Sequence, residues 1–216
     1  LPKNSQWQSP LLDSAIARSQ SLYLETIIDE ANPRALAAEL ARTGFDASLP
    51  PIAERVDPAR RPLLDAAIIK SGVPRSIYDR METWAAAFTL LGQQFKSIGL
   101  EGSEGVETVL RKSFQAAGKP VGQLESNSEQ LGFFDTLPEE AQRALLEGAL
   151  EAPDEMRKSF DAMLAAWLRG DVEAIARTFN DNLAGSPALL DALLKRRNAN
   201  WSKWIEQRMA APGTVL

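Results

Sequence analysis

The sequence predicts an α+β fold that is predominantly α-helical, with a few short strands covered by helices. Apolar residues recur at helical spacing through most of the 216 residues. Two short apolar runs interrupt this pattern, at about residues 21–28 and 120–125, and both are typical of strands. We expect the two strands to be parallel neighbours, as in open α/β sheets, and the whole chain, 1–216, to form a single domain.

In the first half of the chain, caps and prolines indicate where helices begin, and glycines indicate where they end. Ser9-Pro10, for example, is a good N-cap and N1 pair. The stretch from Met81 to Ile98 is apolar nearly all round, so we expect this helix to be central, with Trp84 in the core. The helices predicted here cover residues 10–18, 33–44, 58–72, 74–78, 81–98 and 104–117, the last capped by Ser103.

The second half of the chain is predicted to be helix packed on helix. Ser126-Asn127-Ser128-Glu129 has the pattern of a capping box, which opens a helix directly after the second strand run. The last residues, 211–216, have the pattern of a turn that enters a strand. Further helices are predicted at residues 138–150, 153–168, 171–185 and 187–210.

The composition excludes several classes of function. The net charge is −5 and the isoelectric point is about 5.0, which argues against nucleic acid as a partner. The sequence has no cysteine and no histidine, so it holds no disulfide, no Ser-His-Asp triad and no imidazole ligand for zinc. No apolar run approaches the length needed to cross a membrane. Chemistry in this chain therefore depends on carboxylates, lysine, tyrosine or a metal held by oxygen atoms.

Two glutamates stand at the ends of the predicted strands. Glu25 interrupts the apolar run 21–28, where it marks either the solvated end of a strand or a functional carboxylate, because an unpaired buried carboxylate is costly. Glu125 lies where the second strand ends and the capped helix begins. Ligands bind at such junctions in open α/β sheets. Both residues are therefore candidate site residues.

Three blocks of the sequence resemble the TraB/PrgY/GumN family, which also contains the Tiki membrane proteases. They are LPKNSQWQSPLLDSAIARSQSLYLE, GVETVLRKSFQAAGKPVGQLESNSEQLGFFDTLPEEAQ and LLKRRNANWSKWIE. The resemblance runs across the whole chain and keeps the family's order and spacing. Two glycine-histidine motifs of that family correspond to positions before Leu1 and after a strand beginning near Thr214. The resemblance therefore implies that this sequence is the segment between the two motifs, and that it is inactive without them.

The resemblance also implies a site and an activity. The conserved acids of the family map onto Glu25 and Glu125, and its Arg-Asn pair maps onto Arg197 and Asn198. The implied activity is that of a metal-dependent peptidase or hydrolase, in which two imidazoles and one or two carboxylates hold a divalent ion. Glu25 and Glu125 would divide the roles of ligand and base. Arg197 would orient one of them or bind a substrate carboxylate, with Asn198 and Trp201 as further substrate-binding candidates.

A different class of function remains open at this point. The chain is also consistent with a non-enzymatic peptide- or protein-binding helical module, with a groove lined by Trp84, Trp201 and Trp204. Bacterial single-domain members of the family often carry an export signal, so the resemblance favours a periplasmic or secreted location, with a cytoplasmic one as the alternative. No metal is expected in this histidine-free chain, and a divalent ion is expected only in the full-length protein.

Overall fold

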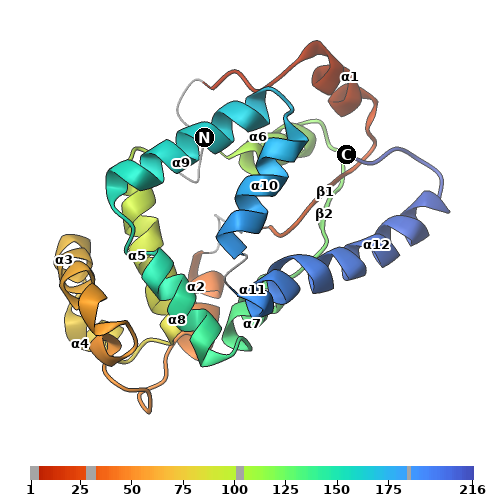
Figure 1. Cartoon of the computed structure of the whole chain (residues 1–216). Coiled ribbons are helices and arrows are strands. Elements are labelled where there is room, and N and C mark those ends of the chain that lie inside the picture. Colours follow the sequence, from red (N-terminus) through yellow and green to blue (C-terminus); the bar gives the residue numbers. More distant parts are fainter. Residues whose placement is uncertain (1–4, 28–32, 101–104, 184–185) are drawn as a thin grey trace.

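The chain is mainly helical and contains one small parallel sheet, which confirms the predicted fold class (Figure 1). The computed structural model describes residues 5–27, 33–100, 105–183 and 186–216. The helices are α1 Pro10–Arg18, α2 Pro33–Thr43, α3 Arg61–Ser71, α4 Arg75–Tyr78, α5 Thr83–Ser97, α6 Val106–Ala116, α7 Asn127–Asp135, α8 Glu139–Gly148, α9 Pro153–Leu168, α10 Val172–Leu183, α11 Pro187–Leu190 and α12 Arg196–Met209.

Helix boundaries follow the local signals closely. Ser9 accepts a hydrogen bond from the backbone N–H of Leu12 at 3.2 Å and so caps α1. Gly72 ends α3 with a φ of 70°, a left-handed conformation that glycine adopts without steric cost. The predicted cap Ser103 and the predicted helix end at residue 185 lie outside the described residues. A π-helical turn, Asp191–Lys195, joins α11 to α12, so the helix predicted as one piece at 187–210 changes its winding within that range.

The two predicted strands pair in parallel, as expected. They are β1 Leu22–Leu24 and β2 Val121–Gln123, and Leu22 is opposite Val121 in the register. Both are shorter than the predicted runs 21–28 and 120–125, and Ile28 lies outside the described residues. The first strand ends early because the chain bends at Glu25. Beyond the bend, the N–H of Ile27 donates to the side chain of Gln123 at 3.0 Å, where a continuing ladder would supply a backbone oxygen.

The C-terminal residues lie along the other edge of β1. Ser21 forms a parallel bridge with Val215, and the N–H of Gln20 donates to the carbonyl of Thr214 at 2.9 Å. The N–H of Tyr23 donates to the carbonyl of Leu216, also at 2.9 Å. Residues 214–216 therefore continue the sheet on the side of β1 opposite to β2, as the predicted turn into a strand suggested.

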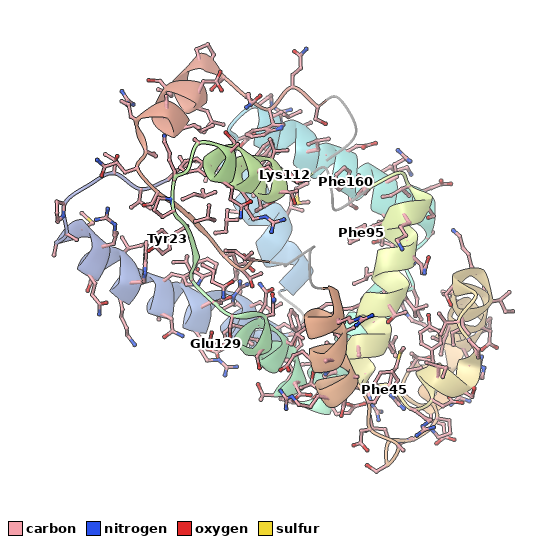
Figure 2. The ribbon with its side chains drawn as sticks, turned by 180° about the vertical axis from the view of Figure 1, so that it is seen from behind. Tyr23, Phe45, Phe95, Lys112, Glu129 and Phe160 are labelled. Atoms are coloured by element: carbon pink, nitrogen blue, oxygen red, sulfur yellow. The ribbon has the colours of Figure 1, made fainter. Side chains whose placement is uncertain are left out.

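Helices α6 and α12 cover opposite faces of this sheet (Figure 1). On one face, Leu22 and Leu24 are buried against Phe114 of α6. On the other face, the ring of Tyr23 lies 4.4 Å from that of Trp204 in α12, and Figure 2 shows Tyr23 between the strands and this helix. The alternation of side chains along β1 therefore assigns one helix to each face.

The largest hydrophobic cluster lies away from the sheet, where α5 packs against α3 and α8. Trp84 of α5 has no exposed surface and packs against Phe88 and Phe134, which confirms the prediction that it belongs to the core. Within the described residues, no helix combines the length and apolarity needed to span a membrane. The main cluster consists of Ile52, Val56, Leu64, Ile68, Tyr78, Ala86, Ala87, Leu90, Leu146, Ala149 and Leu150.

Gly122 is the position in β2 where a side chain would disturb the sheet most directly. A Cβ atom at this position would lie 2.5 Å from the ring of Tyr23, which is already packed on Trp204. We expect Gly122→Ala to lower the free energy of unfolding by about 1–3 kcal/mol, because overpacking forces the Tyr23 ring to shift. Urea unfolding followed by tryptophan fluorescence measures this change.

Gly132→Ala is the matched control for this substitution. Gly132 lies inside α7 and has open space around its Cα, so alanine is expected to be neutral or stabilising there. Adding Tyr23→Ala to Gly122→Ala removes the clash, so the two changes together are expected to cost less than the sum of each alone. If the losses of unfolding free energy are additive, the Tyr23 ring is not the reason why a side chain at position 122 is destabilising.

Candidate functional site

The parallel register brings Glu25 and Glu125 side by side at the carboxyl ends of the two strands. The N–H of Leu124 donates to the carbonyl of Leu24 at 2.9 Å, and the N–H of Glu125 donates to the carbonyl of Glu25 at 3.0 Å. Each glutamate therefore leaves its strand at the same level of the sheet. This edge is where parallel sheets place ligand-binding groups.

The start of α7 fixes the two segments that follow β1 and β2. Ser126 and Glu129 form the predicted capping box, in which each side chain accepts a hydrogen bond from the backbone N–H of the other residue. Asn127 reaches back to the first strand, where it accepts from the hydroxyl of Thr26 at 2.9 Å and donates to the carbonyl of Ile27 at 3.2 Å. The loop after β1 is thus fixed to the helix that follows β2.

Arg197 of α12 binds both carboxylates. Its Nε donates to Oε1 of Glu125 at 3.0 Å, and its Nη2 donates to Oε2 of the same carboxylate at 2.9 Å. Nη2 also pairs with Oε1 of Glu25. The side chains of Arg197 and Glu125 are only 12% and 6% exposed, whereas that of Glu25 is 44% exposed. We call Glu25, Glu125 and Arg197 the acid–arginine cluster.

The guanidinium of Arg197 is enclosed by aromatic rings as well as by anions. Its central carbon lies 4.8 Å from the ring centre of Trp201 and 5.7 Å from that of Phe133, within the range of cation–π attraction. Its Nη1 donates to the carbonyl of Leu193 at 3.4 Å. Burial lowers the pKa of Arg197, but the hydrogen bonds to Glu125 and Glu25 outweigh it and raise the pKa above the ordinary value.

Local helix geometry sets the direction in which Arg197 points. The π-helical turn Asp191–Lys195 ends two residues before it, and an extra residue in a turn rotates everything that follows on the helix. Trp201, four residues later, then lies on the same side of α12 as the guanidinium that it contacts. No pattern in the sequence marks this π turn.

Gln130 is a site residue that the sequence analysis did not identify. Its side-chain amide donates to Oε1 of Glu25, the same oxygen that pairs with Arg197. Gln130 and Phe133 are three residues apart on α7 and therefore share one face of that helix, which is turned toward the cluster. The sequence marks Gln130 by its position near the start of a capped helix, three residues after Asn127. That position does not predict a hydrogen bond to a glutamate 105 residues away.

The remaining predicted residues divide into two groups. Trp201 belongs to the cluster, and its buried indole N–H has no hydrogen-bond partner among the described residues. Asn198 is exposed, and the structure records only its backbone carbonyl, which accepts from the hydroxyl of Ser202 at 2.8 Å. The predicted groove lined by three tryptophans is wrong, because Trp84 is fully buried in the core and Trp204 packs on Tyr23.

The model of the TraB/PrgY/gumN family matches residues 1–216, which confirms the resemblance carried by the three sequence blocks. No curated protein and no solved structure matches the chain.

The bidentate pair of Arg197 and Glu125 is expected to contribute strongly to stability. We expect Arg197→Met to lower the free energy of unfolding by about 3–5 kcal/mol, because it leaves the Glu125 carboxylate buried without a cation. Arg197→Lys is expected to recover only part of the loss, because an ammonium group cannot donate in parallel to both oxygens. Urea unfolding of the purified chain measures both values.

Arg196→Met is the matched control on the same helix. Arg196 pairs with Asp191 at 2.9 Å, but both side chains are about half exposed, so the loss should be less than about 1 kcal/mol. Adding Glu125→Gln to Arg197→Met removes the uncompensated charge and should restore part of the lost stability. Equal losses for Arg196→Met and Arg197→Met would contradict a special role for the buried pair.

Proposed function

Because the chain belongs to the TraB/PrgY/gumN family, we propose that it carries the carboxylates of a hydrolase site for peptides or proteins. The observation that supports this proposal is the meeting of Glu25, Glu125 and Arg197 at the carboxyl ends of two parallel strands. These three side chains come from segments far apart in the sequence. The cluster is also partly open to solvent through Glu25, as a site that receives a substrate must be.

A carboxylate in this position is suited to proton transfer during hydrolysis. It accepts a proton from water while the water oxygen bonds to the peptide carbonyl carbon, and the proton then passes to the amide nitrogen as the C–N bond breaks. Arg197 keeps the two carboxylates at a fixed separation by donating to both. The residues of this chain thereby supply the positioning of the acid groups, which is a prerequisite for their catalytic use.

The divalent ion implied by the resemblance fits the residues of this chain poorly. The sequence has no histidine, and within the described ranges no three Asp or Glu residues gather as a ligand set. Both oxygens of Glu125 accept hydrogen bonds from Arg197, so this carboxylate is engaged as it stands. The metal roles of Glu25 and Glu125 therefore stay a prediction.

The resemblance also suggests a substrate class and a location. We propose a peptide or protein substrate and a periplasmic or secreted location, as the resemblance implies. The net charge of −5 is consistent with a partner other than nucleic acid. A non-enzymatic peptide-binding module is the alternative, and the experiment below separates the two.

Removing the carboxylate of Glu25 should abolish most of the hydrolysis. In the protein as its gene encodes it, we expect Glu25→Gln to lower kcat by about 10²–10⁴-fold with little change in KM, because general-base catalysis contributes by that factor. Turnover of a fluorogenic peptide library measures the change. Glu206→Gln, at an exposed position of α12, is the control and should leave turnover unaltered.

Three further outcomes complete this experiment. The 216-residue chain by itself is expected to show no peptide turnover, because it has none of the histidines that the resemblance implies for activity. Turnover by that chain which is lost in Glu25→Gln would overturn this expectation. Peptide binding that is insensitive both to a chelator and to loss of both glutamates, in a protein without turnover, would favour the binding module.

A further inference from the structure

We propose, on the premise of the proposed function, that the two carboxylates have different roles. Glu125 is a positioning residue that holds Arg197, and Glu25 is the catalytic carboxylate that meets substrate and water. Gln130 is a second positioning residue, which acts through Glu25. This assignment goes beyond the family resemblance, which leaves open which of the two glutamates takes which role.

Glu125 is committed to Arg197 on both of its oxygens. Nε donates to Oε1 at 3.0 Å and to Oε2 at 3.1 Å, while Nη2 donates to Oε2 at 2.9 Å. The residue is 6% exposed, so a substrate has almost no access to it. A buried carboxylate that lost this partner would remain as an uncompensated charge, so exchange of partners during a reaction cycle is unfavourable.

Glu25 has the opposite environment. Arg197 and Gln130 both donate to its Oε1, and the structure records no hydrogen bond to its Oε2 from the residues that it describes. The side chain is 44% exposed. One oxygen thus fixes the orientation of the carboxylate, while the other is available to accept a proton. Such a division is what a general base requires, because it must be held in place and must also reach water.

The charge balance of the cluster leads to the same assignment. Two carboxylates share one guanidinium, so one negative charge remains uncompensated in the acid–arginine cluster. The buried Glu125 forms the bidentate pair, and the residual charge falls on Glu25, where solvent reduces its cost. The arrangement thereby keeps an anionic carboxylate at the accessible side of the cluster.

Gln130 completes the orientation of Glu25 from a second helix. Arg197 approaches Glu25 from α12 and Gln130 from α7, so the carboxylate is fixed from two directions. The amide of Gln130 is half-buried and α7 is itself tied to the loop after β1 through Asn127. Loss of this donor leaves the cluster's charge unchanged but frees Glu25 to rotate.

Carboxyl labelling of the folded 216-residue chain tests the assignment without any hydrolysis assay. A water-soluble carbodiimide activates each accessible carboxylate, glycine ethyl ester converts it into an amide, and mass spectrometry of peptides gives the rate at each glutamate. Glu25 should react at a rate close to that of the exposed Glu206. Glu125 should react more than about a hundredfold slower, because its pair with Arg197 must open first. Equal rates at Glu25 and Glu125 would overturn the assignment.

Gln130→Met keeps the size of the side chain and removes the donor. In the protein as its gene encodes it, this variant should lower kcat about tenfold with KM unchanged, since a hydrogen bond to a charged group is worth that factor. Gln207→Met, on the exposed side of α12, is the control. Unchanged kcat in Gln130→Met would remove Gln130 from the assignment.

Carboxyl labelling and hydrolysis kinetics together distinguish failure of this assignment from failure of the proposed function. If Glu25 labels rapidly, Glu125 is protected and no peptide is hydrolysed, then the division of the two environments stands and the hydrolase proposal fails. If peptides are hydrolysed but Glu125→Gln retains its melting temperature and loses as much kcat as Glu25→Gln, then Glu125 acts directly on substrate. That result would overturn the inference while supporting a hydrolase.

Discussion

The structure around the site depends on one electrostatic constraint. Parallel pairing of β1 with β2 places Glu25 and Glu125 next to each other, and two adjacent carboxylates repel unless a cation lies between them. Arg197 is that cation, and its fork geometry satisfies both oxygens of the buried partner at once. Because Arg197 comes from α12, the ion pair also connects the sheet to the C-terminal helix. The same ion pair therefore holds α12 against the sheet and positions the two carboxylates of the candidate site.

The position of α12 is determined by packing at a distance from the charges. Tyr23 packs against Trp204 because Gly122 leaves room for the ring against β2. This contact sets how closely α12 approaches the sheet, and the π turn Asp191–Lys195 then sets the side on which Arg197 projects. The aromatic contacts of Arg197 with Trp201 and Phe133 are a consequence of that placement. Apolar packing and helix winding thus provide the geometry that the ion pair uses.

Local signals in the sequence predicted the helices and strands well, whereas hydrogen-bond partners of side chains far apart in the sequence were predicted poorly. Ser9-Pro10 and the capping box at Ser126 act within one helical turn, so their outcome could be predicted from neighbouring residues. The end of β1 at Leu24 could not be predicted in this way, because it depends on a hydrogen bond across the sheet, from the N–H of Ile27 to the side chain of Gln123. The same holds for the pairing of Gln130 with Glu25, which the separation along the chain conceals. The two glutamates were recognised as candidates, whereas the cation that joins them was left with two alternative roles.

Arg197 also shows why the two alternatives for its role are not equivalent. An arginine that receives a substrate carboxylate needs free donors in its fork, but Nε and Nη2 already bind Glu125 and Glu25. The register between β1 and β2 keeps these two donors engaged with the carboxylates. A slip of one residue in β1 would turn Tyr23 toward α6 and the neighbouring leucines toward α12, and Glu25 would leave the edge that faces Arg197. Such a slip is opposed from both sides, because β2 pairs with one edge of β1 and residues 214–216 pair with the other. The position of Arg197 between the two carboxylates therefore depends on the register of the sheet.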